Sequence, residues 1–200
     1  MTAFAMAALA ATSAPSPVPS PVWQFDVLVS AGHEGRPASC PRFPKRKCNL
    51  GAAGEREWTP VVADEVTRSL RASGVTVARE PADFDGFFNV EAAVFIHFDG
   101  SDRPCSTGAS IGYHDAGSSV AAKLWRDMYS RYFPFTFMPD NFTVNLRDYY
   151  GFRQVHAEDG ALVIELGEVS CPAQRQWLAG RLKPASDLIA DFIRRLIGKK

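Results

Sequence analysis

The stretch AAVFIHF, residues 92–98, consists of apolar side chains apart from one histidine, His97. An unbroken apolar run of this length is typical of a central strand in a parallel sheet, which is covered by protein on both faces. Shorter runs rich in β-branched residues lie before and after it and predict further strands. They fall at about Gln24 to Ser30, at VTVAR (75–79), at GASIGYH (108–114) and at ALVIEL (161–166).

Segments with helical periodicity alternate with these strands. The first helix is predicted to begin at Thr59, with Pro60 at its first helical position, and to stop at Gly74, because proline is favoured at a helix start and glycine just after its end. Its predicted apolar face is Val62, Val66 and Leu70. A second helix, from Ser119 to Ser130, has Val120, Leu124 and Met128 on its apolar face. A third helix ends at Gly198, and its apolar face is Leu188, Ile189, Phe192, Ile193 and Leu196. This alternation predicts a single three-layer α/β domain, with a mostly parallel central sheet and helices on both faces.

Length and charge limit the possible classes of function. A chain of 200 residues is long enough for one sizeable core, so we expect one domain. Lys plus Arg and Asp plus Glu both number 22, and this balance argues against nucleic acid or an anionic membrane as a partner. The one basic cluster, PRFPKRK (41–47), is predicted to be a solvated loop, with contact to an acidic ligand as the alternative.

The first 22 residues differ in composition from the rest. MTAFAMAALAATSA is small and apolar, too short for the ~20 residues of a membrane span, and its Ala8-Leu9-Ala10 resembles a signal-peptidase site. PSPVPSPV (15–22) favours an extended polyproline spacer. We therefore expect a secretory signal and spacer over residues 1–22, with a disordered tail as the alternative, and a folded domain over residues 23–198 in the periplasm or outside the cell.

The four cysteines support the same compartment. Cys40 and Cys48 lie in one loop, Cys105 and Cys171 each follow a predicted strand, and none belongs to a C-x-x-C pair. This spacing favours two disulfides over a structural zinc site, without fixing which cysteines pair. Four buried thiols in a cytosolic protein are the alternative.

Three of the predicted strands lead to residues that can bind a metal. His33, His97 and Glu165 follow or end these strands, and residues at the carboxyl ends of parallel strands share one rim of the sheet. A catalytic zinc site typically has three protein ligands and a water whose pKa falls to about 7, with a nearby carboxylate as general base. Such a site needs a further acid, and Glu55 and Glu57 are available just before the first helix.

These motifs resemble the zinc-dependent N-acetylmuramoyl-L-alanine amidases, which cleave peptidoglycan between the lactyl group and the stem peptide. VLVSAGHEG (27–35) is similar to their first strand and glycine-histidine turn, and FIHFDGS to their second-histidine motif. LVIELGEVSC resembles their valine-glutamate-x-glycine-phenylalanine-x-serine-asparagine segment, and GASIGYH their glycine-rich strand. The resemblance extends from about Val27 to Gly198.

The resemblance implies roles for individual residues. Zinc would be bound by His33, His97 and a glutamate ahead of the first helix, and Glu165 would be the catalytic carboxylate. Glu55 places Ala63 and Gly74 in step with the family's helix and is the favoured third ligand. Pro60 argues for a late helix start, and this would favour Glu57 instead.

The same comparison shows departures that bear on the substrate. Glu168 stands where the family has phenylalanine, Cys171 stands where it has asparagine, and residues 132–148 do not match its usual loop. Residues 132–158 have no clear period, and we predict no element there. The expected function is hydrolysis of the amide between N-acetylmuramic acid and L-alanine, with peptidoglycan or a muropeptide as substrate. A zinc peptidase or amidohydrolase acting on another acyl-amino bond, and a cell-wall-binding module without catalysis, are the alternatives.

Overall fold

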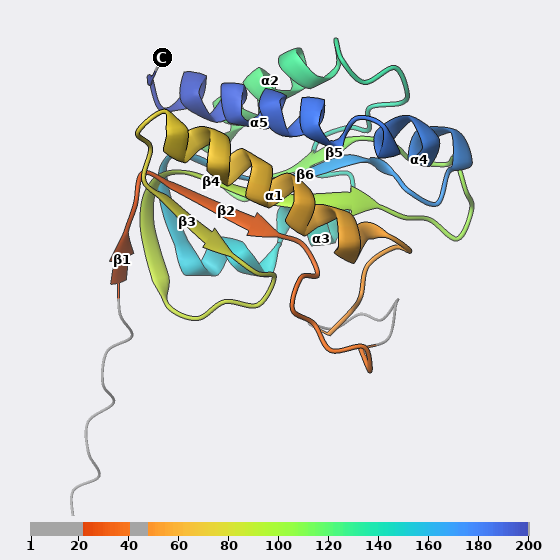
Figure 1. The fold of residues 1–200 in the computed structure, drawn as a ribbon, viewed down its shortest axis with the longest axis horizontal. Helices are drawn as coiled ribbons and strands as arrows, with labels where there is room; N and C mark the ends of the chain where they lie inside the picture. Colours follow the sequence, from red (N-terminus) through yellow and green to blue (C-terminus); the bar gives the residue numbers. More distant parts are fainter. Residues whose placement is uncertain (1–21, 41–47, 200) are drawn as a thin grey trace, which may run out of the picture.

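The computed structural model describes residues 22–40 and 48–199, which form one α/β domain (Figure 1). The predicted signal and most of the spacer (1–21), and the basic cluster (41–47), lie outside the described residues. Among the described residues, the strands are β1 (Val22–Gln24), β2 (Val27–Ala31), β3 (Val77–Glu80), β4 (Phe87–Asp99), β5 (Ser110–Gly112) and β6 (Val155–Glu168). The helices are α1 (Glu55–Ala72), α2 (Ser118–Tyr129), α3 (Val144–Arg147), the 3-10 helix η1 (Tyr150–Gln154), α4 (Pro172–Ala179) and α5 (Leu182–Leu196).

The sheet is mostly parallel, as the sequence predicts. Its strand order is β3-β2-β4-β6-β5, and β1 pairs with the beginning of β4. Every pair is parallel except β5 with β6. The apolar run 92–98 lies within β4, between β2 and β6, and the residues from Ala92 to Phe98 are all buried. Because β4 is central, the residues near its carboxyl end have neighbours on both sides.

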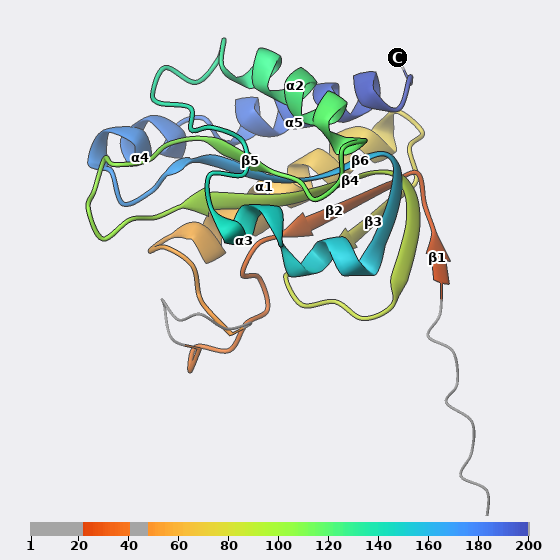
Figure 2. The same ribbon diagram turned by 180° about the vertical axis from the view of Figure 1, so that it is seen from behind.

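The two faces of the sheet are covered differently (Figure 2). Ile96 and Ile164 point to one face, where they join a core with side chains of α1, α2 and α5. Phe95 and Val163 point to the other face, where they pack with Leu146 of α3 and with aromatic side chains near η1. We call these the closed face and the open face. The expected three layers are present, with long helices on one face only.

Two predicted helix features are wrong. Helix α1 begins at Glu55, not at Thr59, so Pro60 lies inside the helix. Contacts of Glu55 with the core stabilise the extra turn and outweigh the local preference of proline. In α2, Val120 is 71% exposed. Leu124 and Met128 are partly buried and pack against the core, as predicted. The fully buried positions are Trp125 and Tyr129, one position further along the chain.

The strands also differ in detail from the prediction. The expected strand from Gln24 to Ser30 is two strands, β1 and β2, separated by two residues. Helix α4 was not predicted, although Pro172 at its start and Gly180 at its end are the usual boundary signals. The unassigned region 132–158 contains α3, η1 and the first part of β6. In the described parts of the chain, no helix combines the length and the apolar composition that crossing a membrane requires.

Candidate metal centre

His33 lies in the turn that follows β2. Its backbone has φ of 62°, a left-handed conformation that is uncommon for residues other than glycine and that often marks a functional site. Gly32, just before it, lies against the ring of His97, and a Cβ atom at Gly32 would overlap that ring. The glycine-histidine pair therefore lets the two imidazoles approach each other, with ring centroids 5.0 Å apart in an edge-to-face arrangement.

His97 and Glu165 are neighbours on adjacent strands. His97 of β4 is directly opposite Glu165 of β6 in the parallel register, so both side chains point to the open face. Neither residue ends its strand, because β4 continues to Asp99 and β6 to Glu168. The prediction that both strands end at these residues is wrong, but the expected proximity of the two side chains is confirmed.

Glu55 is the first residue of α1 and is 2% exposed. Its carboxylate accepts hydrogen bonds from the backbone N–H groups of Ala52 and Phe98. Arg175 of α4 donates to the carbonyl of Ala53 in the turn just before α1. Glu55 is therefore held by two backbone N–H groups, and Arg175 holds the turn that leads into it, which explains why the helix includes Glu55.

His33, Glu55 and His97 bring one donor atom each to a common point. Glu55 Oε1 lies 3.2 Å from His33 Nε2 and 2.9 Å from His97 Nδ1, and all three donor atoms lie within 4.8 Å of one another. Donor atoms around a tetrahedral ion with bonds of about 2.1 Å lie about 3.4 Å apart. Two nitrogens and one carboxylate oxygen at this spacing can hold a metal ion.

The charge states of Glu55 and His97 suit metal binding. Burial by itself raises the pKa of Glu55, but hydrogen bonds with His33 and His97 outweigh it and lower this pKa to about 2. Burial lowers the pKa of His97 below its usual value of 6.5, so this imidazole is neutral at pH 7. An ionised carboxylate and a neutral imidazole are the forms in which these side chains bind metals.

Glu165 lies beside this cluster with an unsatisfied carboxyl group. Its Oε2 is shielded from solvent and has no hydrogen-bond partner among the described residues. Burial, and then the nearby charges of Glu55 and Asp99, raise the pKa of Glu165 well above its usual value. A buried carboxyl without a partner is costly, and a cation held by the neighbouring cluster would offset this cost.

The cluster lies in a cleft on the open face. The cleft has a volume of about 430 Å³, which is enough for part of a small ligand. It is lined by the cluster and Glu165, and by Asp99 and the residues beside it. Residues from α3, from the segment that follows it and from the start of η1 form another side, among them Asn145, Asp148, Tyr149 and Tyr150. Asp99 Oδ2 is also buried without a hydrogen-bond partner in the described structure.

Of the two candidate third ligands, Glu55 and not Glu57 lies beside the histidines. The Glu57 side chain is 62% exposed, whereas Glu55 lies between the two histidines. The late helix start that favoured Glu57 does not occur. Sequence reasoning missed the aromatic side of the cleft at Tyr149 and Tyr150, because the region around them has no periodic pattern.

The two departures noted near Glu165 belong to one structural unit. Cys171 forms a disulfide with Cys105, and Cys40 forms another with Cys48, so two disulfides are confirmed. Glu168 is fully buried and accepts hydrogen bonds from Cys105 N, from Thr107 N and Oγ1, and from Ser170 Oγ. A buried carboxylate and a disulfide therefore fasten the β4–β5 loop to the end of β6.

Comparison with known proteins gives matches among solved structures. No protein-family model and no curated protein matches the chain. The chain is similar to the N-acetylmuramyl-L-alanine amidase Ami1 from Mycobacterium smegmatis, with 19% identity and a TM-score of 0.63. The match covers 88% of this chain and 97% of that chain. It is also similar to the catalytic domain of CwlV, an N-acetylmuramoyl-L-alanine amidase from Bacillus (Paenibacillus) polymyxa var. colistinus, with 18% identity and a TM-score of 0.63. This match covers 87% of this chain and 98% of that chain.

A third match comes from another group of bacteria. The N-acetylmuramoyl-L-alanine amidase AmiC2 of Nostoc punctiforme has 16% identity and a TM-score of 0.64, with 88% of this chain and 98% of that chain covered. Identities at this level establish similarity of fold. The protein therefore has the fold of the catalytic domains of N-acetylmuramoyl-L-alanine amidases.

Proposed function

We propose that the protein is a zinc-dependent hydrolase that cleaves the amide bond between N-acetylmuramic acid and the L-alanine of the peptidoglycan stem peptide. The observation that carries the proposal is the convergence of His33, Glu55 and His97 on one point, with the unpartnered carboxyl of Glu165 beside it. Two histidines and a glutamate form one of the ligand sets of catalytic zinc sites. The shared fold with structures named as amidases supports the choice of substrate.

Each residue of the cleft has a separate task in this reaction. Zinc, when bound by His33, Glu55 and His97, supplies a Lewis acid that polarises the scissile carbonyl and acidifies water. Glu165 takes the proton of the attacking water and delivers it to the nitrogen of the leaving L-alanine. The free stem peptide and the lactyl carboxylate are the products.

The proposed location is the periplasm or the exterior of the cell, where peptidoglycan is accessible. The two disulfides support an oxidising compartment. A secretory signal over residues 1–14 and a spacer up to residue 22 complete this proposal, and N-terminal sequencing of the secreted protein would identify the cleavage site.

The test uses the zinc-loaded protein with purified sacculi and soluble muropeptides. Mass spectrometry is expected to find free stem peptide and glycan that ends in an intact lactyl group. Glu165→Gln should bind one zinc ion, as the wild type does, and hydrolyse at least about 100-fold more slowly, because a general base contributes 10²- to 10⁴-fold. Glu55→Gln should lose zinc binding as well.

Glu57→Gln is the matched control, because Glu57 is a solvent-exposed glutamate in the same helical turn as Glu55. It should retain both zinc and hydrolysis. Cleavage by Glu165→Gln at the wild-type rate would contradict the role of Glu165. Cleavage within the stem peptide would indicate a peptidase, and sedimentation with sacculi without any product would indicate a binding module.

A further inference from the structure

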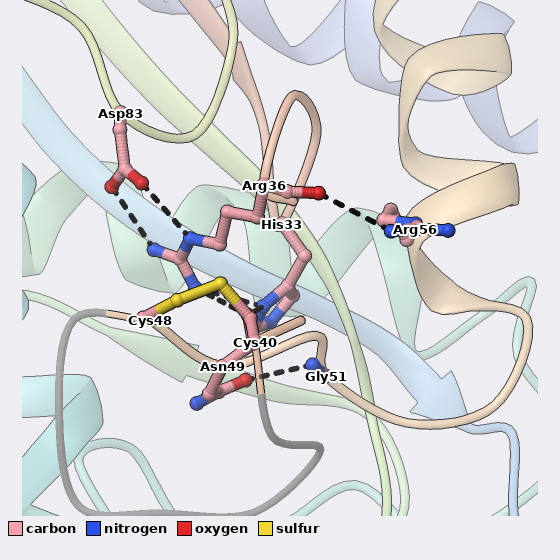
Figure 3. Close-up of a disulfide and its surroundings, with 8 residues drawn as sticks. All are labelled: His33, Arg36, Cys40, Cys48, Asn49, Gly51, Arg56 and Asp83. Atoms are coloured by element: carbon pink, nitrogen blue, oxygen red, sulfur yellow. Dashed lines mark hydrogen bonds and ion pairs between the residues drawn. A yellow bond between two sulfur atoms is a disulfide. The ribbon is translucent and has the colours of Figure 1, made fainter. Parts of the chain in front are cut away.

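Arg36 is a buried arginine that does not belong to the metal cluster. It is 7% exposed and lies in the loop that follows β2 (Figure 3). Its Nε and Nη2 donate to the two carboxylate oxygens of Asp83 at 3.2 and 3.3 Å. Burying a guanidinium is costly unless its N–H groups are paired. The Asp83 contact anchors one edge of the guanidinium and leaves the other edge directed at the cluster.

That other edge reaches His33 both directly and through the carbonyl of Asn49. Arg36 Nη1 lies 3.0 Å from His33 Nδ1. Arg36 Nη1 and His33 Nδ1 each lie 2.9 Å from Asn49 O, and a carbonyl oxygen can accept two hydrogen bonds. When His33 donates from Nδ1 to this carbonyl, its Nε2 carries a free lone pair. Nε2 is the nitrogen that lies 3.2 Å from Glu55 Oε1, inside the cluster.

A second path leads from Arg36 to His97 through two tyrosine hydroxyls. Arg36 Nη2 donates to Tyr150 Oη at 3.1 Å, and Tyr150 gives its own proton to the carbonyl of Ala82. Tyr149 Oη then donates to Tyr150 Oη at 3.2 Å. Each hydroxyl has one proton, so the oxygen of Tyr149 can only accept from its remaining neighbour.

That remaining neighbour is His97 Nε2, which lies 3.2 Å from Tyr149 Oη. An accepting hydroxyl at this place suits the form of His97 that binds a metal through Nδ1, in which Nε2 carries the proton. Nδ1 is the nitrogen that lies 2.9 Å from Glu55 Oε1. The two histidines therefore present different ring nitrogens to the cluster.

We propose that Arg36 is a positioning residue that holds both histidine rings in the orientation in which His33 presents Nε2 and His97 presents Nδ1 to the metal. The proposal rests on the metal site of the proposed function. The partner of the outward nitrogen sets the tautomer and orientation of a ligating histidine, and loss of such partners typically weakens metal binding 10- to 100-fold. Arg36 is connected to both outward partners, so one substitution disturbs both ligands.

The first experiment compares Arg36→Met with the wild type. Methionine keeps the length and packing of the side chain and removes every N–H donor. The dissociation constant for Zn²⁺, measured by competition with a chromophoric chelator, is expected to rise about 10- to 100-fold. Arg126→Met is the matched control, because Arg126 bonds Asp140 and the carbonyl of Met138 in a similar way outside the cleft. Its zinc affinity should equal that of the wild type.

The second experiment reads the tautomers directly. Long-range ¹H–¹⁵N correlation spectra of the zinc-loaded wild type should show His33 protonated at Nδ1 and His97 protonated at Nε2. The exposed His114 and His156 provide reference signals in the same spectrum. In zinc-loaded Arg36→Met, the signals of at least one of the two buried rings should broaden or split, because that ring is no longer held in one orientation.

A third variant keeps the proposal testable if Arg36→Met does not fold. Tyr149→Phe removes only the hydroxyl that faces His97 and should also weaken zinc binding about 10-fold. Zinc affinity within twofold of the wild type in Arg36→Met, or His97 protonated at Nδ1 in the zinc-loaded wild type, would overturn the proposal. None of these measurements uses a substrate, so the inference can fail while hydrolysis of peptidoglycan is confirmed. Equally, the role of Arg36 can be confirmed while hydrolysis of peptidoglycan fails.

Discussion

The closed and open faces of the sheet share the same strands but have different covers. On the closed face, long helices bury large side chains completely, and Trp125 stacks on Tyr129 with ring centroids 4.7 Å apart. On the open face, short helical segments cover the sheet incompletely, and the cleft lies at the carboxyl end of the strands. Alternation along β4 and β6 sends apolar residues to both faces and the two reactive side chains to the open one.

The difference indicates that stability and chemistry are separated within one sheet. Glu165 and Glu168 illustrate this separation within a single strand. Glu168 is fully buried and its carboxylate accepts four hydrogen bonds, whereas Glu165 Oε2 has no partner in the described structure. A satisfied buried carboxylate stabilises the fold, and an unsatisfied one is available for a ligand or a proton.

The largest expected effect is a loss of stability from the closed face. Trp125→Ala removes a fully buried ring and should lower the free energy of unfolding by about 5 kcal/mol, the upper end for such truncations. Leu146→Ala, on the open face, should cost about 2 kcal/mol, because the space that it leaves is open to the cleft. Chemical denaturation measures both values. Equal losses would show that the two faces do not differ in this way.

The two disulfides should also contribute unequally to stability. Cys105–Cys171 closes a loop of 66 residues and Cys40–Cys48 one of 8, so chain entropy predicts losses of about 4 and about 2.5 kcal/mol when each is replaced by serines. Thermal unfolding under oxidising conditions measures these losses. Removal of the Cys40–Cys48 disulfide should also weaken zinc binding. Asn49, whose carbonyl accepts from His33, follows Cys48 directly. Unchanged zinc affinity in that variant would mean that the loop holds Asn49 without its disulfide.

Glu168 should make stability depend on pH. Burial raises its pKa, but hydrogen bonds from Ser170, Thr107 and Cys105 outweigh burial and lower the pKa below its usual value of 4.5. A lowered pKa contributes stability that is fully present above pH 4.5 and is lost as the pH falls through the folded value. Glu168→Gln should therefore cost about 2 kcal/mol at pH 7.

This cost should shrink at lower pH, because the wild-type carboxyl becomes protonated there. Denaturation curves at pH 7 and at several values below 4.5 measure the change. Glu158→Gln is the control, because Glu158 is an exposed residue of the same strand. A cost that does not depend on pH would mean that Glu168 acts through its shape rather than its charge.

The convergence of the site could be predicted from the sequence because it follows from strand geometry. Apolar runs that lead to His33, His97 and Glu165 indicate parallel strands with a shared rim, and parallel pairing then brings these residues together. Glu55 required the family resemblance, because local signals placed the helix start at Thr59.

The rest of the cleft could not be predicted, for reasons that are also physical. Arg36, Asn49 and Tyr149 lie in loops whose conformations depend on contacts between distant segments, and such contacts leave no periodic pattern in the sequence. In α2 only Val120 departs from the prediction, because the small alanines Ala121 and Ala122 are buried in its place, whereas Leu124 and Met128 pack against the core. Propensity alone does not distinguish these alternatives.

The smallest expected change in stability comes from a pair of glycines with similar backbones. Gly51 and Gly74 have φ of 68° and 81°, so the left-handed backbone alone should cost alanine about 1 to 2 kcal/mol at either position. A Cβ at Gly74 would meet nothing within 4 Å, whereas one at Gly51 would overlap Glu55 and His33. Gly51→Ala should therefore lose most of its zinc affinity, and Gly74→Ala should lose none. Calorimetric zinc titration of both variants separates backbone strain from damage to the site, since equal zinc affinities would show that the cluster tolerates displacement of Glu55.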